Sequence, residues 1–259
     1  MDSMRKVLTI LLLVCAFSIS AFPAQTAPRA EIKAFNGIPS LFIKNRPSPP
    51  FAYMSYLGET RFYREAAEAG IHLYCFPAYL GDRGINSTSG IGPFRPSIWT
   101  AENRFDYSSI ENDFDRILLA DPSASVIIRL HLDVPRWWEE KHPAECALQP
   151  DGTLLRQSFS SELWKKQAGE ALENCVRWLL KSPYASHLAG IHVAAGFTEE
   201  WFYHFSQRFS DASPPRIAAF RQWLRQRYLD DLSSLRKAWG LENIRFDNAC
   251  PADIGGVES

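Results

Sequence analysis

The sequence predicts an α/β fold whose parallel sheet is built from successive strand–helix units. Four short apolar runs, at residues 51–56, 71–76, 125–132 and 188–194, have the length and composition of buried strands. Segments with helical spacing of apolar residues separate these runs. A chain of 259 residues that is 46% apolar can bury a large core without a disulfide or a metal. Together these observations are typical of a sheet covered by helices.

The predicted helices follow the strands in order. A helix over 60–69 ends at Gly70, a residue type favoured just after a helix. Ser108 and Glu111 have the spacing of a capping box at the start of a helix over 108–120. Three further amphipathic helices are expected: a long one over 161–181, one that starts at 214, and a short one over 232–239. The apolar face of the helix that starts at 214 would hold Ile217, Phe220, Trp223, Leu224 and Tyr228.

A β-hairpin is expected before the first buried strand. Residues 32–43 hold Asn36-Gly37 between two apolar stretches, which is a strong signal for a two-residue hairpin turn. Pro39 cannot donate a backbone hydrogen bond, so the second arm should lie at an edge.

Charge and composition restrict the partners. The chain has 28 Lys and Arg against 29 Asp and Glu, and no basic run, which argues against binding of nucleic acid or of an anionic membrane surface. The expected partner is therefore a neutral small molecule or polymer. Aromatic residues make up 13% of the chain, including 8 Trp, and many stand beside polar residues. Such rings often stack on sugars, although core packing is their commoner use.

The N-terminus resembles a secretory signal peptide over residues 1–27. Arg5 and Lys6 precede an apolar run over 7–19, and Ala21, Ala24 and Ala27 follow it. The run is shorter than the about 20 residues that a membrane-spanning helix needs. Export to the periplasm or the medium is therefore favoured over a permanent anchor, and also over lipidation at Cys15.

Four cysteines follow the signal peptide: Cys75, Cys146, Cys175 and Cys250. None forms a C-x-x-C pair, so a zinc site is disfavoured. Cys75 and Cys175 lie within apolar patterns, which favours buried thiols over disulfides.

The third predicted strand carries polar residues on one face. Phosphate-binding glycine motifs and G-x-S-x-G are absent, which disfavours a nucleotide cofactor and a serine hydrolase. Arg129, His131 and Asp133 alternate along the strand and so share a face. They suit a buried polar network or hydrogen bonds to a substrate. A metal site with His142 or His192 as a third ligand is the weaker alternative.

Two adjacent tryptophans, Trp137 and Trp138, follow this strand in a predicted loop. Neighbouring rings in a loop are hard to bury together, so one of them is a candidate sugar platform, with core packing as the alternative.

The fourth strand is followed by two adjacent acids, Glu199 and Glu200. Aromatic side chains flank them, and desolvation by such neighbours could raise the pKa of one carboxyl, as a general acid requires. The alternative is a pair of acids that favour a helix N-terminus through the dipole. The flanking aromatic residues are Phe197, Trp201, Phe202 and Tyr203.

The sequence resembles a known protein family over residues 31–247. The segments that carry this resemblance are Pro135-Arg136-Trp137-Trp138, His142-Pro143-Ala144-Glu145, Asp151-Gly152, Ser158-Phe159, Phe220 to Tyr228, Leu235, Ala238-Trp239-Gly240, Tyr53, the Asp106 region and Glu200-Trp201. They resemble glycoside hydrolase family 42. The resemblance implies a (β/α)8 TIM barrel, retaining β-galactosidase-type hydrolysis, no cofactor, and a substrate-binding role for residues such as Tyr53 and Trp201.

On this pattern Glu200 is the general acid/base. Glu199 takes the place of the family's usual Asn, which contacts the 2-hydroxyl of the sugar, and this departure puts ordinary galactosidase specificity in doubt. The family's nucleophile is a Glu after the seventh strand, and only four strands are counted here. Asp133 is a weak candidate for a substitute.

The domain expectation follows from this count. Residues 28–50 would form the hairpin and lead-in, 51–247 the N-terminal half of a barrel, and 248–259 a tail. A half-barrel has open sheet edges, so self-association or docking of the missing half is expected. Two alternatives to a truncated glycosidase stay open: a non-catalytic carbohydrate-binding or scaffold protein, and an unrelated exported hydrolase that uses His131 and Asp133.

Overall fold

The computed structural model describes residues 30–49, 51–82, 94–149, 151–196, 198, 200–202 and 211–251. The predicted signal peptide, Glu199, Phe197, Tyr203 and residues 252–259 of the predicted tail lie outside these ranges. None of the helices within them has the length and apolar character that crossing a membrane requires.

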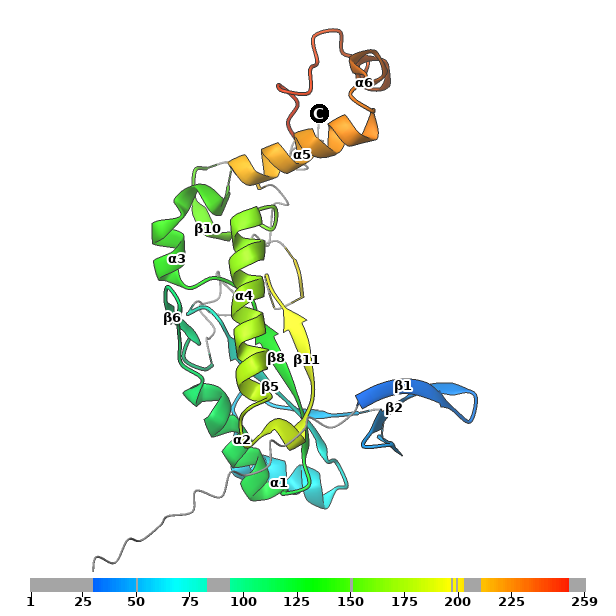
Figure 1. The fold of residues 1–259 in the computed structure, drawn as a ribbon, viewed down its shortest axis with the longest axis vertical. Coiled ribbons are helices and arrows are strands. Elements are labelled where there is room, and N and C mark those ends of the chain that lie inside the picture. Colours follow the sequence, from blue (N-terminus) through cyan, green and yellow to red (C-terminus); the bar gives the residue numbers. More distant parts are fainter. Residues whose placement is uncertain are drawn as a thin grey trace, which may run out of the picture.

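A parallel four-stranded sheet lies at the centre of the molecule (Figure 1). Its strands are β4 (Tyr53–Met54), β5 (Leu73–Tyr79), β8 (Ser125–His131) and β11 (Leu188–Ala194). Their order in the sheet, β4-β5-β8-β11, follows their order in the chain, and every neighbouring pair is parallel. The predicted strand–helix alternation is confirmed, and this stepwise winding is the one a (β/α)8 barrel uses.

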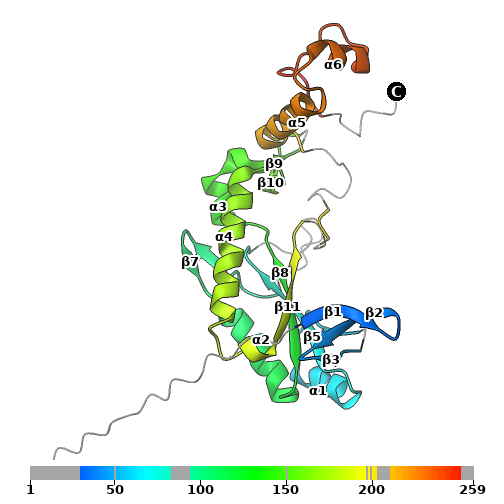
Figure 2. The same ribbon diagram turned by 45° about the vertical axis from the view of Figure 1, so that its right-hand side comes forward.

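Helices cover one face of the sheet (Figure 2). They are α1 (Thr60–Glu68), α2 (Ser108–Ala120) and α4 (Glu162–Leu179). Alternate residues of β5 and β8 point toward them, and Phe76, Ile128 and Leu130 are fully buried there. Phe76 meets Phe114 of α2 edge to face, with ring centroids 5.5 Å apart. Each such side chain contributes roughly 1.5–3 kcal/mol by leaving water, so this layer holds the helices to the sheet.

The helix ends follow the sequence signals with one exception. Gly70 adopts φ +81° just after α1, as expected of a helix-terminating glycine. Ser161 caps α4, where its Oγ accepts a hydrogen bond from the Trp164 backbone at 3.0 Å. The capping box at Ser108 is wrong, because Tyr107 occupies the N-cap position without a side-chain bond. Asp106 Oδ1 instead accepts from the backbone N–H of Ser108 at 2.9 Å.

The predicted N-terminal hairpin is present. β1 (Ala30–Phe35) pairs antiparallel with β2 (Ile38–Ile43), and Asn36 and Gly37 have φ of 51° and 79°, as a two-residue turn requires. The expectation that the second arm is an edge is wrong in part. A short third strand, β3 (Arg46–Pro47), pairs with the far end of β2, although it does not extend as far as Pro39.

Two small hairpins and one helix were not expected. β6 (Trp99–Ala101) pairs with β7 (Arg104–Phe105), and β9 (Cys146–Leu148) pairs with β10 (Leu154–Gln157). The predicted loop that carries the two tryptophans is the helix α3 (Arg136–Lys141). Successive residues of a helix point about 100° apart, so adjacent rings can be buried to different extents. Two 3₁₀ turns, η1 (Pro143–Glu145) and η2 (Ala185–His187), complete this part.

The C-terminal helices form a second, smaller apolar cluster. α5 (Pro214–Arg227) and α6 (Leu232–Trp239) pack around Leu224, Leu235, Phe246 and Ala249. The predicted apolar face of α5 is only partly buried, because Leu224 is 1% exposed while Trp223 is 53% exposed. In Figure 1 these helices lie beyond the end of α4, away from the β1–β2 hairpin.

The four cysteines among the described residues are thiols. Cys146 and Cys175 are buried, Cys75 is half-buried and Cys250 is exposed. This confirms thiols over disulfides at Cys75 and Cys175, although only Cys175 is buried as predicted and Cys75 is half-buried.

Candidate active site at the strand ends

The candidate site lies on the face of the sheet opposite α1, α2 and α4. Residues that alternate with the core-facing ones share this face: Pro77, Arg129 and His192 form one row across the strands, and Tyr79, His131 and Ala194 form the next. When parallel strands close into a barrel, the face away from the helices turns inward, and the carboxyl ends of the strands form the active-site end.

Arg129 is the cation of the more open row. It is half-buried, and its guanidinium donates a hydrogen bond to the hydroxyl of Tyr56 at 3.2 Å. His192 pairs with it in register on β11 and is exposed. Tyr56 was missed by the sequence reasoning, although it lies two residues after β4, where site residues are expected in such a fold.

His131 lies deeper, toward the strand ends. Its side chain is 2% exposed, and its ring packs against Tyr79 of β5 with centroids 5.0 Å apart. His131 Nδ1 is 3.8 Å from Asp133 Oδ2. Within the described ranges, no three His, Cys, Asp or Glu side chains gather closely enough to hold a metal ion.

Asp133 is the centre of a buried polar network. Its Oδ2 accepts a hydrogen bond from Arg156 at 2.5 Å, and its Oδ1 accepts from the Gln157 amide at 2.6 Å and from the Gly196 backbone at 3.0 Å. Gln157 also accepts a bond from the Val134 backbone at 3.1 Å. Because both carboxylate oxygens are occupied and Asp133 is 5% exposed, its role here is to brace the strand ends.

A β-bulge brings both partners to Asp133. The β9–β10 register shifts between Leu155 and Gln157, and Arg156 at that position has φ of +49°. A bulge directs two consecutive side chains to the same side of a strand, which alternation alone forbids. Arg156 and Gln157 were therefore missed by the sequence reasoning, and the Asp151-Gly152 turn before them was the only local signal.

The chain turns sharply after β11. Gly196 has φ of +83°, and a Cβ there would lie 2.2 Å from the carbonyl oxygen of Phe202, so only glycine fits. The backbone N–H of Trp201 donates to Ala195 at 2.8 Å, and the Trp201 indole donates to Val193 at 3.2 Å. Thr198 and Trp201 both have positive φ. Strained backbone of this kind is typical of functional turns.

This turn presents Glu200 and Trp201 to solvent. Glu200 is exposed, and its Oε2 accepts a hydrogen bond from the Thr198 hydroxyl at 3.1 Å. Trp201 is 49% exposed, with Phe159 packed 6.0 Å from it, centroid to centroid. Glu200 is therefore exposed to water, and the aromatic residues that the structure describes do not desolvate its carboxyl group as predicted.

The remaining predicted site residues lie elsewhere. Trp138 is fully buried, and its indole donates to Gln167 at 2.6 Å, so it belongs to the core. Trp137 is half-buried, and its indole donates to the Trp99 carbonyl at 3.0 Å on the helix side of the sheet. Tyr53 packs edge to face on Tyr63, also on the helix side. The structure does not bring these three side chains to the face that carries Arg129.

The sheet and the helices on one of its faces define a part of a TIM barrel. The chain matches a β-galactosidase from the psychrophilic Marinomonas ef1 with a TM-score of 0.56 and 16% identity, over 80% of this chain and 30% of that one. It matches a GH42 β-galactosidase from G. stearothermophilus with a TM-score of 0.50 and 16% identity, over 76% and 26%. The catalytic domain of β-amylase from Paenibacillus polymyxa gives a TM-score of 0.52 and 12% identity, over 78% and 52%.

The chain thus resembles the β-galactosidases of glycoside hydrolase family 42 in fold, and it spans about 30% of the length of the Marinomonas enzyme. No protein-family model and no curated protein matches its sequence. At this identity the likeness concerns the fold, so function has to be argued from the site itself.

Proposed function

We propose that this chain supplies the sugar-binding face and the general acid/base of a retaining glycosidase of the β-galactosidase type. The observation that carries the proposal is the turn after β11, which presents an exposed Glu200 beside an exposed Trp201 at the active-site end of the sheet. A carboxyl group and an aromatic platform side by side are what protonation of a bound glycoside needs.

Each residue has a defined role in this proposal. Glu200 donates a proton to the oxygen of the leaving group and then takes one from the attacking water. Trp201 stacks on the apolar face of the sugar, and Arg129 and His192 contact its hydroxyls from the open face of the sheet. The resemblance assigns Glu199 to the neighbourhood of the 2-hydroxyl.

The nucleophile is expected from outside these four strands. A retaining enzyme needs a second carboxylate about 5 Å from the acid/base, and Asp133 has both oxygens bonded to buried partners. A strand paired with β11 would extend the sheet toward a closed barrel. We propose that a further segment of the same protein, or a partner chain, supplies that strand and the nucleophile.

A second candidate is a non-catalytic carbohydrate-binding protein. The occupied carboxylate of Asp133 favours it, because the described strand ends then offer Glu200 without a partner acid. In both cases the ligand is a sugar bound at the same turn.

Hydrolysis of 4-nitrophenyl β-D-galactoside tests the proposal in two preparations: the 259-residue chain, and the protein made from the full reading frame of the gene. Turnover with retained anomeric configuration in the second preparation, lost in Glu200→Gln, supports a glycosidase. Saturable galactoside binding without turnover in both supports the non-catalytic candidate. If neither preparation binds or hydrolyses the galactoside, both candidate functions are contradicted.

Export is a further part of the proposal. Fractionation of the native host should place the protein in the periplasm or the medium, with its N-terminus near residue 28. A cytoplasmic protein that retains residues 1–27 would contradict export.

A further inference from the structure

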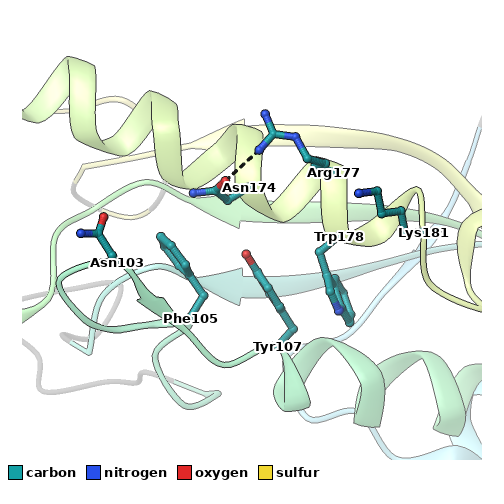
Figure 3. Close-up of a pocket in the computed structure, with 7 residues that line it drawn as sticks. All are labelled: Asn103, Phe105, Tyr107, Asn174, Arg177, Trp178 and Lys181. Atoms are coloured by element: carbon teal, nitrogen blue, oxygen red, sulfur yellow. Dashed lines mark hydrogen bonds between the residues drawn. The ribbon is translucent and has the colours of Figure 1, made fainter.

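A second aromatic groove lies on the helix side of the sheet, away from Arg129 and Glu200. It runs between the second half of α4 and the β6–β7 hairpin and has a volume of about 410 Å³. Figure 3 shows the seven side chains that line it. They are Asn103, Phe105, Tyr107, Asn174, Arg177, Trp178 and Lys181.

Three near-parallel rings form a row along this groove. Tyr107 stacks on Trp178 with centroids 4.4 Å apart, and Phe105 lies 6.2 Å from Tyr107 with planes only 8° apart. All three are half-buried. Burial raises the pKa of Tyr107 to about 12, so its hydroxyl stays protonated and can donate a hydrogen bond. Figure 3 shows this hydroxyl pointing toward α4 and Asn174.

Amide groups complete the lining. Asn103 projects from the β6–β7 turn, where its φ is +56°, and Asn174 faces the groove from α4. The side-chain oxygen of Asn174 accepts a hydrogen bond from Arg177 at 3.1 Å. This bond orients the Asn174 side chain and leaves its amide N–H groups for a ligand. Arg177 also pairs with Glu173 at 2.5 Å, so its charge is compensated.

The groove continues toward α3. A smaller pocket of about 70 Å³ shares Asn103, Phe105 and Asn174 with it and reaches Trp99, Trp137 and Gln167. Gln167 and Lys181 stand on or just after α4, and at 1.5 Å per residue the two positions are about 20 Å apart. An elongated ligand could therefore lie along the helix.

The chemistry of the lining favours a neutral sugar chain. Because Tyr107 is stacked between Phe105 and Trp178, ring edges and the Tyr107 hydroxyl line the groove beside the amides, and they match the C–H groups and hydroxyls of a sugar. A polyanion is disfavoured, because Glu102 and Glu170 line the continuation and Lys141 is already paired with Glu102 at 2.5 Å. We infer that this groove is an accessory binding site for a neutral oligosaccharide chain, separate from the strand-end turn.

The choice of probe rests on the proposed function, so a β-1,4-linked galactotetraose is titrated into the 259-residue protein by calorimetry. Trp178→Ala should weaken binding at this site at least tenfold. Asn174→Ala removes the amide without touching the ring stack, and it should weaken binding as well even if Trp178→Ala fails to fold. Trp223→Ala is the matched control, because Trp223 is 53% exposed on α5 and outside the groove.

The variants separate this inference from the proposed function. Loss of one binding event in both groove variants, with the control unchanged and Trp201→Ala affecting another event, supports two sites. If binding is lost only in Trp201→Ala, the groove is not a binding site, and the proposal for the strand-end turn is unaffected. Absence of any saturable binding overturns the groove as a galactoside site, while hydrolysis by the full-length protein would still test Glu200.

Discussion

Asp133, just after β8, accepts a hydrogen bond at 3.0 Å from the backbone N–H of Gly196, just after β11. The same carboxylate is held by Arg156 and Gln157 of the β9–β10 hairpin. The turn that carries Glu200 and Trp201 is thereby fixed to a buried ion pair, and the position of the proposed acid depends on residues that do not touch the sugar.

Asp133→Asn should destabilise the protein by about 3–5 kcal/mol, because it removes the negative charge from the buried ion pair that Asp133 forms with the guanidinium of Arg156, 1% exposed. Urea unfolding measures this change. Glu173→Gln is the matched control, since it removes an exposed i,i+4 pair with Arg177 that contributes about 0.2–0.5 kcal/mol. Equal losses in the two variants would mean that the buried pair does not anchor the turn.

Gly196→Ala should also destabilise the protein, because both the positive φ and the 2.2 Å approach of the Phe202 carbonyl exclude a Cβ. We expect a loss above about 1 kcal/mol. Gly169→Ala on α4 is the control: nothing lies within 4 Å of its Cβ position, and alanine in a helix should stabilise by about 0.5–1 kcal/mol. If both substitutions changed the free energy of unfolding in the same direction, the described turn would be contradicted.

Asp121 should contribute to acid sensitivity. Burial alone would raise the pKa of Asp121, but hydrogen bonds from Ser123 and His72 outweigh burial and lower the pKa below its ordinary value. A lowered pKa stabilises the fold above the unfolded value of about 3.9, and the contribution is lost as the pH falls through the folded value. Tyr74 also donates to this carboxylate at 3.1 Å.

Asp121→Asn should therefore cost about 1.5–3 kcal/mol at pH 7, the range for hydrogen bonds to a charged group. Urea midpoints of both proteins, measured from about pH 5 down to pH 3, should converge. A difference that grows as the pH falls would contradict this assignment.

The cysteines should differ in reactivity. Burial raises the pKa of Cys175 to about 12, so almost none of it is thiolate at pH 8, whereas Cys250 is exposed. Labelling with a maleimide at pH 8, followed by peptide mass mapping, should modify Cys250 in the native protein and Cys175 only after denaturation. Rapid labelling of Cys175 in the native state would show that the α4 core opens.

Periodicity in the sequence was enough to predict the sheet and most helices. The apolar runs predicted the strands of the sheet, and Gly70 predicted the end of α1. The helices over 108–120 and 232–239 have the predicted bounds. The capping box failed for a local reason and the tryptophan loop for a tertiary one. Asp106 competes for the Ser108 backbone, and α3 can form because Trp138 is buried against the core.

The site was only partly predictable. Alternation along β8 placed Arg129 and His131 on one face correctly, whereas Asp133 lies two residues beyond the end of the strand. The partners of Asp133 come from a bulge, and a bulge breaks the alternation on which such reasoning depends. Tyr53 was carried over by resemblance, yet register with Tyr74 places it on the helix side.

The central claim is that Glu200 protonates the leaving group, and a comparison of leaving groups tests it most directly. In the protein made from the full reading frame, Glu200→Gln should slow hydrolysis of an alkyl β-galactoside far more than hydrolysis of 2,4-dinitrophenyl β-galactoside. The activated phenol leaves without a proton, so only the poor leaving group needs the acid. Equal losses on both substrates would contradict the assignment of Glu200 as the acid/base.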